Sequence, residues 1–239
     1  MDEQIETALQ HAFPDRSVAE AGSTGPSWND LNRTVELTFE DGETVYLKIS
    51  TAGDAERIAR ERALLAYVGA NVDVPVPTIA AADPTYEVPY LATDAVDGDS
   101  LIRRWAEADT DERRTLITEV VRTFATLHGE RFESHGQIVG GDADGLELDE
   151  GSWTEVLIAQ IEQMERIAPT QRFPDCFDRV IDAVEANRGR LDDAPAALLH
   201  GDPAHPNGFV DDGRVGLLDW EIAHVGDPAR ELHRAPRQL

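Results

Sequence analysis

The chain has 239 residues, of which 41% are hydrophobic, and its 47 aspartates and glutamates outnumber 21 lysines and arginines to give a formal net charge of −26. This apolar content is sufficient for a folded core and excludes disorder of the whole chain. A charge of this sign repels phosphate backbones and anionic lipid headgroups, so we expect neither nucleic acid nor a membrane surface as a partner.

The first fifty residues predict a helix followed by a β-hairpin. Apolar side chains recur every four residues at the N-terminus, which is typical of one helix face. Two later segments alternate apolar and polar side chains on either side of an Asp-Gly dipeptide, a strong hairpin signal. A stretch rich in glycine and serine is expected to be a loop between a short strand and the hairpin. The residues are 1–13 for the helix, 21–27 for the loop, and 33–39 and 44–49 for the two strands.

The next segment changes from a period of two to the helical period. A helix is predicted over residues 54–68, with Gly69 as its stop signal, because Ile58, Leu65 and Val68 fall on one face. Prolines end this pattern, and two short β-prone segments and a turn between lobes are expected to follow. These lie at residues 78–82, 89–93 and 96–100 respectively.

The second half of the chain is predicted to be mainly helical. Thr110 is a candidate cap for a helix that ends before Gly129, and acidic residues in its first turn suit the helix dipole. A Gly/Asp-rich stretch is interpreted as a loop, and two amphipathic helices and two short apolar runs come after it. The loop is residues 133–151, the helices are about 153–167 and 175–191, and the apolar runs are 197–199 and 215–218.

Lys48 is the only lysine beside 20 arginines, and it falls within a predicted strand. The segment lacks a preceding GxxxxG, which excludes a Walker phosphate loop, and no Rossmann fingerprint is present. A lysine on a strand that follows a small-residue loop can hold an ammonium group near phosphates. Glu61 lies on the apolar face of the following helix, where a carboxylate needs a partner, and Lys48 is the candidate. Alternatively, Glu61 reaches solvent at the edge of that face.

A second group of polar residues follows the two late apolar runs. Asp202 and Asn207 lie five residues apart in one loop, and Asp219 ends the second run. Oxygen-bearing side chains on loops beside buried strands suit a hard cation such as Mg²⁺ and a base that orients a hydroxyl group. Each residue alone could instead be an ordinary turn former, loop residue or cap.

Four segments together resemble the aminoglycoside phosphotransferase and choline kinase-like family of small-molecule kinases. The segments are VYLKIS, RERALLAYV, LLHGDPAHPN and GLLDWEIAHVGDP, in this order and at the family's spacing. The resemblance implies an α+β, two-lobed, protein-kinase-like fold. It also implies transfer of the γ-phosphate of ATP to a hydroxyl group of a small-molecule acceptor, with Mg²⁺. The implied lobes are a nucleotide-binding lobe over residues 1–95, formed by an antiparallel sheet with one helix, and a mostly helical lobe over residues 96–239.

The resemblance also implies roles for individual residues. Lys48 would contact the ATP phosphates and Glu61 would position it. Asp202 would be the catalytic base, and Asn207 and Asp219 would bind Mg²⁺. The residues implied to cover the nucleotide are Gly22, Ser23, Gly25 and Ser27, and those implied to meet adenine through their backbone are Thr93, Asp94, Ala95 and Val96.

Two departures from the family pattern leave alternatives open. Ala204 stands where relatives often have a histidine, and the chain ends at Leu239, whereas relatives continue with helices that help wall the acceptor site. We therefore expect an open acceptor pocket, a pocket completed by a second subunit in a homo-oligomer, or a shortened remnant. The last alternative is a nucleotide-binding pseudokinase. The HxDxxH segment indicates an alternative from a different class of function, a metallohydrolase. Its candidate metal ligands are His200, Asp202, His205, Asp219 and His224.

Other features receive a structural interpretation. His200 is expected to brace the loop by hydrogen bonding, His128 to end the long helix, and Asp227 to cap a helix that begins at Pro228.

The single Cys176 precludes an intramolecular disulfide, and the N-terminus lacks the pattern of a secretion signal. A cytoplasmic protein is expected. The preference for arginine and acidic residues resembles the solvated surface of a halophilic protein.

Overall fold

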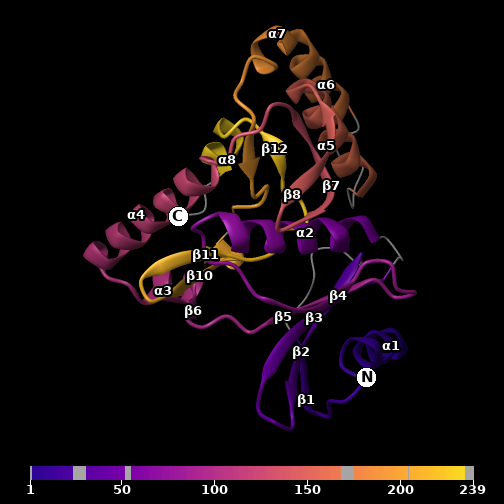
Figure 1. Ribbon diagram of the computed structural model, residues 1–239. Coiled ribbons are helices and arrows are strands. Elements are labelled where there is room, and N and C mark those ends of the chain that lie inside the picture. The colour runs from indigo at the N-terminus through magenta and orange to yellow at the C-terminus, as the bar shows by residue number, and fades with distance from the viewer. Residues whose placement is uncertain (1, 24–30, 52–54, 168–174, 204, 235–239) are drawn as a thin grey trace.

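The computed structural model describes residues 2–23, 31–51, 55–167, 175–203 and 205–234. One part of the molecule is a five-stranded antiparallel sheet in the order β1-β2-β3-β5-β4 (Figure 1). The predicted hairpin is confirmed as β2 and β3, whose register places Thr34 opposite Lys48. The strands are β1 (Val18–Ser23), β2 (Asn32–Phe39), β3 (Thr44–Ser50), β4 (Ile79–Asp83) and β5 (Tyr90–Asp94).

Helix α1 (Glu3–Ala12) covers one face of this sheet. Its buried residues Ile5 and Leu9 pack in a cluster with apolar side chains of β2, β3 and β5, which include Leu37 and Leu47. The predicted N-terminal helix is therefore confirmed, and burial of its apolar stripe attaches it to the sheet.

Helix α2 (Ala55–Asn71) lies between the sheet and the rest of the molecule in Figure 1. Its apolar side chains, such as Leu64 and Val68, belong to a second and larger cluster, which also contains Leu127, Leu198 and Trp220 from the C-terminal half. The stop predicted at Gly69 is wrong, because the helix continues to Asn71. A Cβ at Gly69 would touch only Val76, at an ordinary 3.5 Å, so no left-handed turn requires a glycine there.

The C-terminal part combines helices with two small sheets, in the orders β11-β10-β6 and β8-β7-β12-β9. The helices are α3 (Leu101–Glu107), α4 (Thr110–Leu127), α5 (Trp153–Ile167), α6 (Cys176–Ala186), α7 (Arg188–Leu191) and α8 (Ala229–Arg234). The strands are β6 (Asp99–Ser100), β7 (His135–Asp142), β8 (Gly145–Gly151), β9 (Ala197–Leu199), β10 (Gly208–Asp211), β11 (Arg214–Leu217) and β12 (His224–Gly226), and a short 3₁₀ helix covers His205–Asn207.

The loop predicted over residues 133–151 is wrong, because this stretch forms the β7–β8 hairpin. Ile138 is fully buried, and Leu146 and Leu148 pack against the larger cluster, so an apolar face exists where the glycines and aspartates suggested none. Gly141 has a φ of +128°, and a Cβ there would meet the carbonyl of Gly145 at 2.3 Å, which explains a glycine in this turn.

Four smaller predictions also need correction. The cap of α4 is Asp109 rather than Thr110. The predicted helix over 175–191 is divided at Asn187 into α6 and α7. Part of the predicted loop over 21–27 is strand, because β1 extends to Ser23, and part of the turn over 96–100 is β6, which pairs with β10.

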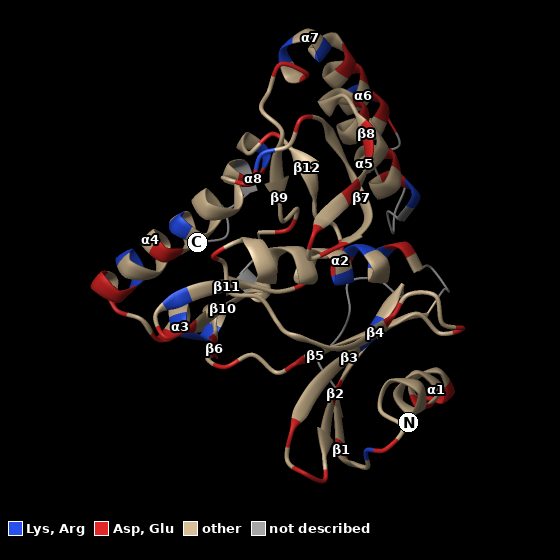
Figure 2. Ribbon diagram, in the orientation of Figure 1, with Lys and Arg blue, Asp and Glu red and all other residues tan. Residues whose placement is uncertain are grey.

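Charge is distributed over the whole molecule. Figure 2 shows acidic residues on both the sheet side and the helical side, with arginines interspersed on α2, α3 and α4. Within the described residues, no helix has the length and the apolar character needed to cross a bilayer.

Candidate active site

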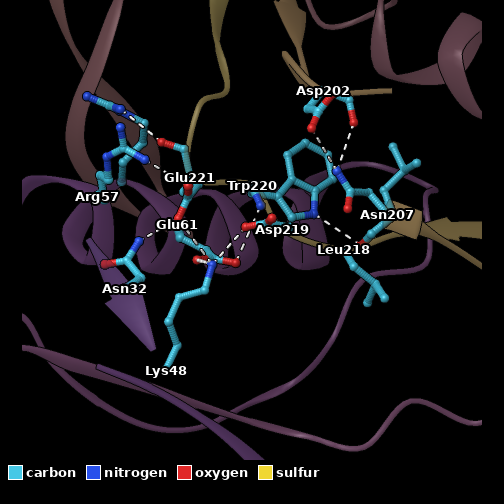
Figure 3. Close-up of polar contacts among 12 residues, drawn as sticks. Asn32, Lys48, Arg57, Glu61, Asp202, Asn207, Leu218, Asp219, Trp220 and Glu221 are labelled. Carbon is cyan, nitrogen blue, oxygen red and sulfur yellow. Dashed lines mark hydrogen bonds and ion pairs between the residues drawn. The ribbon is translucent and has the colours of Figure 1, made fainter. Parts of the chain in front are cut away.

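The site is centred on the ammonium group of Lys48, on β3. Its Nζ donates to Glu61 Oε2 at 2.7 Å and to Asp219 Oδ1 at 2.7 Å, and it lies 3.4 Å from Glu221 Oε2 (Figure 3). The Lys48 side chain is 15% exposed and that of Glu61 only 8%, whereas that of Asp219 is 46% exposed. The predicted pairing of Glu61 with Lys48 is therefore confirmed, and the alternative that Glu61 reaches solvent is wrong.

Two further side chains hold Glu221. Arg57 Nη1, from α2, donates to Glu221 Oε1 at 2.8 Å, and Asn32 Nδ2, from β2, donates to Glu221 Oε2 at 2.6 Å. The backbone is held as well, because Arg60 Nη1 donates to the carbonyl of Glu221 at 2.9 Å. The segment that carries Asp219 is thereby connected to both β2 and α2.

The acidic neighbours alter the pKa values in this cluster. Burial alone would lower the pKa of Lys48, but the attraction of Glu61, Asp219 and Glu221 outweighs it and raises that pKa well above the usual range. Burial raises the pKa of Glu61, and Lys48 opposes this shift. For Asp219, the attraction of Lys48 outweighs burial and lowers the pKa. Lys48 is therefore a permanent cation at neutral pH, and Asp219 is a permanent anion.

Asp202 and Asn207 form a second polar group, in the loop after β9. Asn207 Nδ2 donates to Asp202 Oδ2 at 3.2 Å and to the Asp202 carbonyl at 3.1 Å. The backbone N–H of Leu218 donates to the carbonyl of Asn207 at 2.8 Å, so the loop is attached to the residue that precedes Asp219. Figure 3 shows Asp202 and Asn207 on the far side of Trp220 from Lys48.

His200 braces this loop, as predicted. Its Nε2–H donates to the Leu218 carbonyl at 2.9 Å, and its Nδ1 accepts from the backbone N–H of Asp202 at 3.3 Å. The ring is fully buried, edge-on to Trp220 at a centroid distance of 4.6 Å. His200 therefore fixes the backbone of Asp202 relative to the Asp219 segment and has no ring nitrogen left for a metal.

The backbone on either side of the site adopts left-handed conformations. Gly201 has a φ of +87°, and a Cβ there would meet the carbonyl of Ile222 at 2.4 Å, so only glycine fits beside Asp202. Asp219 has a φ of +62°, which is uncommon for a residue with a side chain and is typical of functional sites.

A buried carboxylate anchors the loop from the other side. Glu231, on α8, is 2% exposed; it accepts from the backbone N–H of Gly201 and, at 2.7 Å, pairs with Nε2 of His128 at the end of α4. Asp227 caps α8 by accepting from the backbone N–H of Ala229 at 2.9 Å. The structural interpretations of His128 and Asp227 are therefore confirmed.

Asp219 and Asn207 carry the oxygen atoms that a divalent cation needs, whereas Glu61 and Glu221 are already engaged by Lys48 and Arg57. Carboxylate oxygens of Glu61, Asp219 and Glu221 lie within 4.8 Å of one another. Two cationic side chains, Lys48 and Arg57, lie beside these carboxylates. The half-exposed Asp219 carboxylate and the Asn207 side chain offer the oxygen ligands that Mg²⁺ prefers.

The predicted nucleotide-contacting residues divide into three groups. Gly22 and Ser23 lie at the end of β1, opposite Glu36 and Val35 of β2. Gly25 and Ser27 lie outside the described residues. Thr93 and Asp94 end β5, and Ala95 and Val96 follow it. The backbone N–H of Asp94 donates to Thr78 and that of Ala95 to Thr44, so these two amides are used within the sheet.

The metallohydrolase alternative is not supported by the described histidines. His200 uses both ring nitrogens as described above. His224 Nδ1 bonds the carbonyl of Ile222 at 3.0 Å, and its Nε2 accepts from Arg230 at 2.9 Å. Neither ring therefore offers a lone pair to zinc.

Sequence reasoning missed Arg57, Glu221 and Asn32. Arg57 precedes Glu61 by one helical turn and thus shares its face, which was a usable signal. Glu221 follows Asp219 by two residues, but its partners on β2 and α2 are 189 and 164 residues away in the chain. Only the fold brings these residues together.

Comparisons with known proteins identify a family and a fold. A family model described as the phosphotransferase enzyme family matches residues 24–236. The crystal structure of aminoglycoside phosphotransferase APH(4)-Ia matches 97% of this chain and 75% of its own, with 15% sequence identity and a TM-score of 0.68. The GDP complex of aminoglycoside 2'-phosphotransferase-IIIa matches 99% of this chain and 79% of its own, with 15% identity and a TM-score of 0.64. The predicted two-lobed α+β, kinase-like fold is thereby confirmed.

Two curated relatives match a shorter stretch. They are subtelomeric hrmA-associated cluster proteins from two strains of Aspergillus fumigatus, each 29% identical over 115 residues, which is 45% of this chain. The match spans 23% of the length of those relatives.

Proposed function

Because the chain belongs to the phosphotransferase enzyme family, we propose that it moves the γ-phosphate of ATP to a hydroxyl group of a small molecule. The observation that carries this proposal is the position of Lys48, whose ammonium group contacts both Glu61 and Asp219. Two related solved structures support it, because ternary complexes of APH(4)-Ia contain hygromycin B with ADP or with AMP-PNP.

Each polar group has a role in the proposed reaction. Lys48 contacts the phosphates of ATP, and Glu61 fixes the Lys48 ammonium group from α2. Asp202 accepts the proton of the acceptor hydroxyl as its oxygen attacks the γ-phosphorus, while the bond from phosphorus to the ADP oxygen breaks. Asn207 and Asp219 hold Mg²⁺, which when bound neutralises phosphate charge. Most of the catalysis comes from positioning and charge neutralisation.

The remaining expectations complete the proposal. The first lobe, residues 1–95, holds the nucleotide beneath the segment that contains Gly22, Ser23, Gly25 and Ser27. The backbone of Thr93–Val96 meets adenine. The second lobe, residues 96–239, carries the catalytic loop and the metal ligands, and the acidic surface adapts the protein to a cytoplasm of high salt.

A screen of hydroxylated small molecules for ADP release, in molar KCl with Mg²⁺ and ATP, tests the function. We expect at least one acceptor to stimulate release, with the phosphate recovered on it. If calorimetry detects binding of Mg·AMP-PNP while no acceptor is phosphorylated, the chain is a pseudokinase and the proposed transfer is wrong.

The assignment of the base is tested with Asp202→Asn. Loss of general-base catalysis should lower kcat by roughly 10²- to 10⁴-fold, while the affinity for Mg·AMP-PNP stays unchanged, because Asp202 faces the acceptor and not the nucleotide. The exposed Asp193 provides a matched control, since Asp193→Asn removes the same charge away from the site. Wild-type turnover in Asp202→Asn contradicts the assignment.

A further inference from the structure

The cluster around Lys48 contains a third carboxylate that the proposed reaction does not use. Glu221 has a side chain that is 14% exposed, and its Oε2 lies 3.4 Å from Lys48 Nζ. A free carboxylate there would compete with Glu61 and Asp219 for the one ammonium group. The distances show that Lys48 binds the other two carboxylates more closely. Its Nζ lies 2.7 Å from Glu61 and from Asp219 but 3.4 Å from Glu221.

Arg57 explains this difference. Its side chain is 6% exposed and its Nη1 lies 2.8 Å from Glu221 Oε1. The other oxygen of Glu221 accepts from the Asn32 amide at 2.6 Å. Both carboxylate oxygens of Glu221 therefore have a close donor other than Lys48. The guanidinium of Arg57 therefore supplies the positive charge next to Glu221.

The geometry also connects three segments of the chain. Arg57 and Glu61 lie one turn apart on α2, and they reach Glu221 and Lys48 respectively. Glu221 and Asp219 lie two residues apart after β11. The Arg57–Glu221 pair therefore fixes the distance from α2 to the Asp219 segment, and Lys48 bridges the same two segments from β3.

We propose that Arg57 and Glu221 are positioning residues for the phosphotransfer site, with Arg57 neutralising Glu221 so that Lys48 serves Glu61 and Asp219. This inference rests on the proposed function for its kinetic consequence. The structural part of the inference concerns which of the three carboxylates the Lys48 ammonium group contacts. This part can be measured without turnover.

The single lysine of the chain makes that measurement direct. Protein labelled with ¹³C-lysine gives one Cε signal, which reports on the Lys48 ammonium group alone. We expect Arg57→Met to shift this signal, because Glu221 then draws the ammonium group away from Glu61 and Asp219. Adding Glu221→Gln to Arg57→Met removes the competitor and should return the signal toward its wild-type position.

A matched control lies on the same helix. Arg62 contacts the carbonyl of Gly141 at 3.5 Å and takes no part in the cluster, so Arg62→Met removes an equal charge from α2. We expect no shift of the lysine signal in this variant. An unchanged signal in Arg57→Met, or a double variant that stays as displaced as the single one, overturns the proposal. If Arg57→Met does not fold, the double variant Arg57→Met/Glu221→Gln decides, because it removes both members of the buried pair, and a signal displaced far from the wild-type position in that variant also overturns the proposal.

Kinetics provide the second readout. Arg57→Met should lower kcat/KM for Mg·ATP by about 10- to 100-fold, the usual cost of removing a partner that orients a directly acting residue, and the double variant should recover most of the loss. Equal losses in Arg57→Met and in the double variant contradict positioning through Glu221. If the wild-type chain transfers no phosphate, the proposed function fails while the lysine signal still decides the Arg57–Glu221 pairing.

Discussion

His224 is a buried histidine that the structure holds in its neutral form. It is 1% exposed, stacks on Trp153 at a centroid distance of 5.8 Å, donates from Nδ1 to Ile222 and accepts at Nε2 from Arg230. Burial, followed by the repulsion of the Arg230 cation, lowers its pKa to about 3. Protonation would break the hydrogen bond from Arg230, so the neutral ring is part of the fold.

This pKa predicts a loss of stability in mild acid. The unfolded chain binds a proton at His224 near pH 6.5, whereas the folded chain binds it only near pH 3. The stabilisation that comes from the neutral ring is therefore complete above pH 6.5 and is lost as the pH decreases from 6.5 toward 3. The free energy of unfolding should therefore fall by about 2 kcal/mol more between pH 7 and pH 5 in wild type than in His224→Gln. Urea titrations at the two pH values measure the difference, and equal decreases in both proteins contradict it.

The site residues differ in how far the sequence predicted them. Lys48 was identified because the chain has only one lysine, and Glu61 because a carboxylate fell on an apolar helix face. Asp202, Asn207 and Asp219 depended on their joint spacing. Arg57 and Glu221 were missed because an arginine on a helix and a glutamate in a loop are ordinary in a chain with this composition, and their pairing depends on the fold.

At the level of elements, the cap of α4 gives a discriminating test. The Asp109 side chain accepts from the backbone N–H groups of Asp111 and Glu112, and the Glu112 side chain accepts from the N–H of Asp109, which is a full capping box. Asp109→Ala should therefore lower the free energy of unfolding by about 0.5–2 kcal/mol.

Thr110→Ala is the matched control for this cap. The residue is the first of the helix and not its cap, so we expect its replacement by alanine, a strong helix former, to leave stability nearly unchanged. Chemical unfolding of both variants in the same buffer measures the difference. If Thr110→Ala lowers the free energy of unfolding more than Asp109→Ala does, Thr110 is the cap, as the sequence alone indicated.

The elements themselves were predictable where the pattern is local. Helix α2 and the β2–β3 hairpin each carry their period over many residues, so their existence followed from the sequence. The β7–β8 hairpin was missed because glycines and aspartates dilute its alternation, and its strands gain stability from packing on α2 and pairing with β12. The apolar run over residues 197–199 revealed β9, whereas β12 was missed, because a three-residue strand without such a run depends on its pairing with β7 and β9.

At the scale of the whole molecule, the net charge predicts a dependence on salt. A charge of −26 on 239 residues makes the compact state repel itself, and added ions screen that repulsion. The thermal midpoint of unfolding should therefore rise between low and molar KCl. Differential scanning calorimetry measures it, with sorbitol at equal osmolality as the control for effects that are not electrostatic. A midpoint that is the same at both KCl concentrations contradicts the prediction.

The two apolar clusters do not coincide with the two lobes, because α2 belongs to the first lobe in sequence but packs in the cluster of the C-terminal half. Helix α2 buries Leu64 and Val68 in the cluster that it shares with Trp220 and Leu198, whereas the far face of the sheet packs with α1 in a cluster of its own. Leu91 of β5 also belongs to the cluster that contains α2, so a domain movement that preserved both clusters would carry the sheet and α2 together. The separation between Lys48 on the sheet and Glu61 on the helix would then stay constant during such a movement, and a dye pair on β2 and α2 could test this in single molecules.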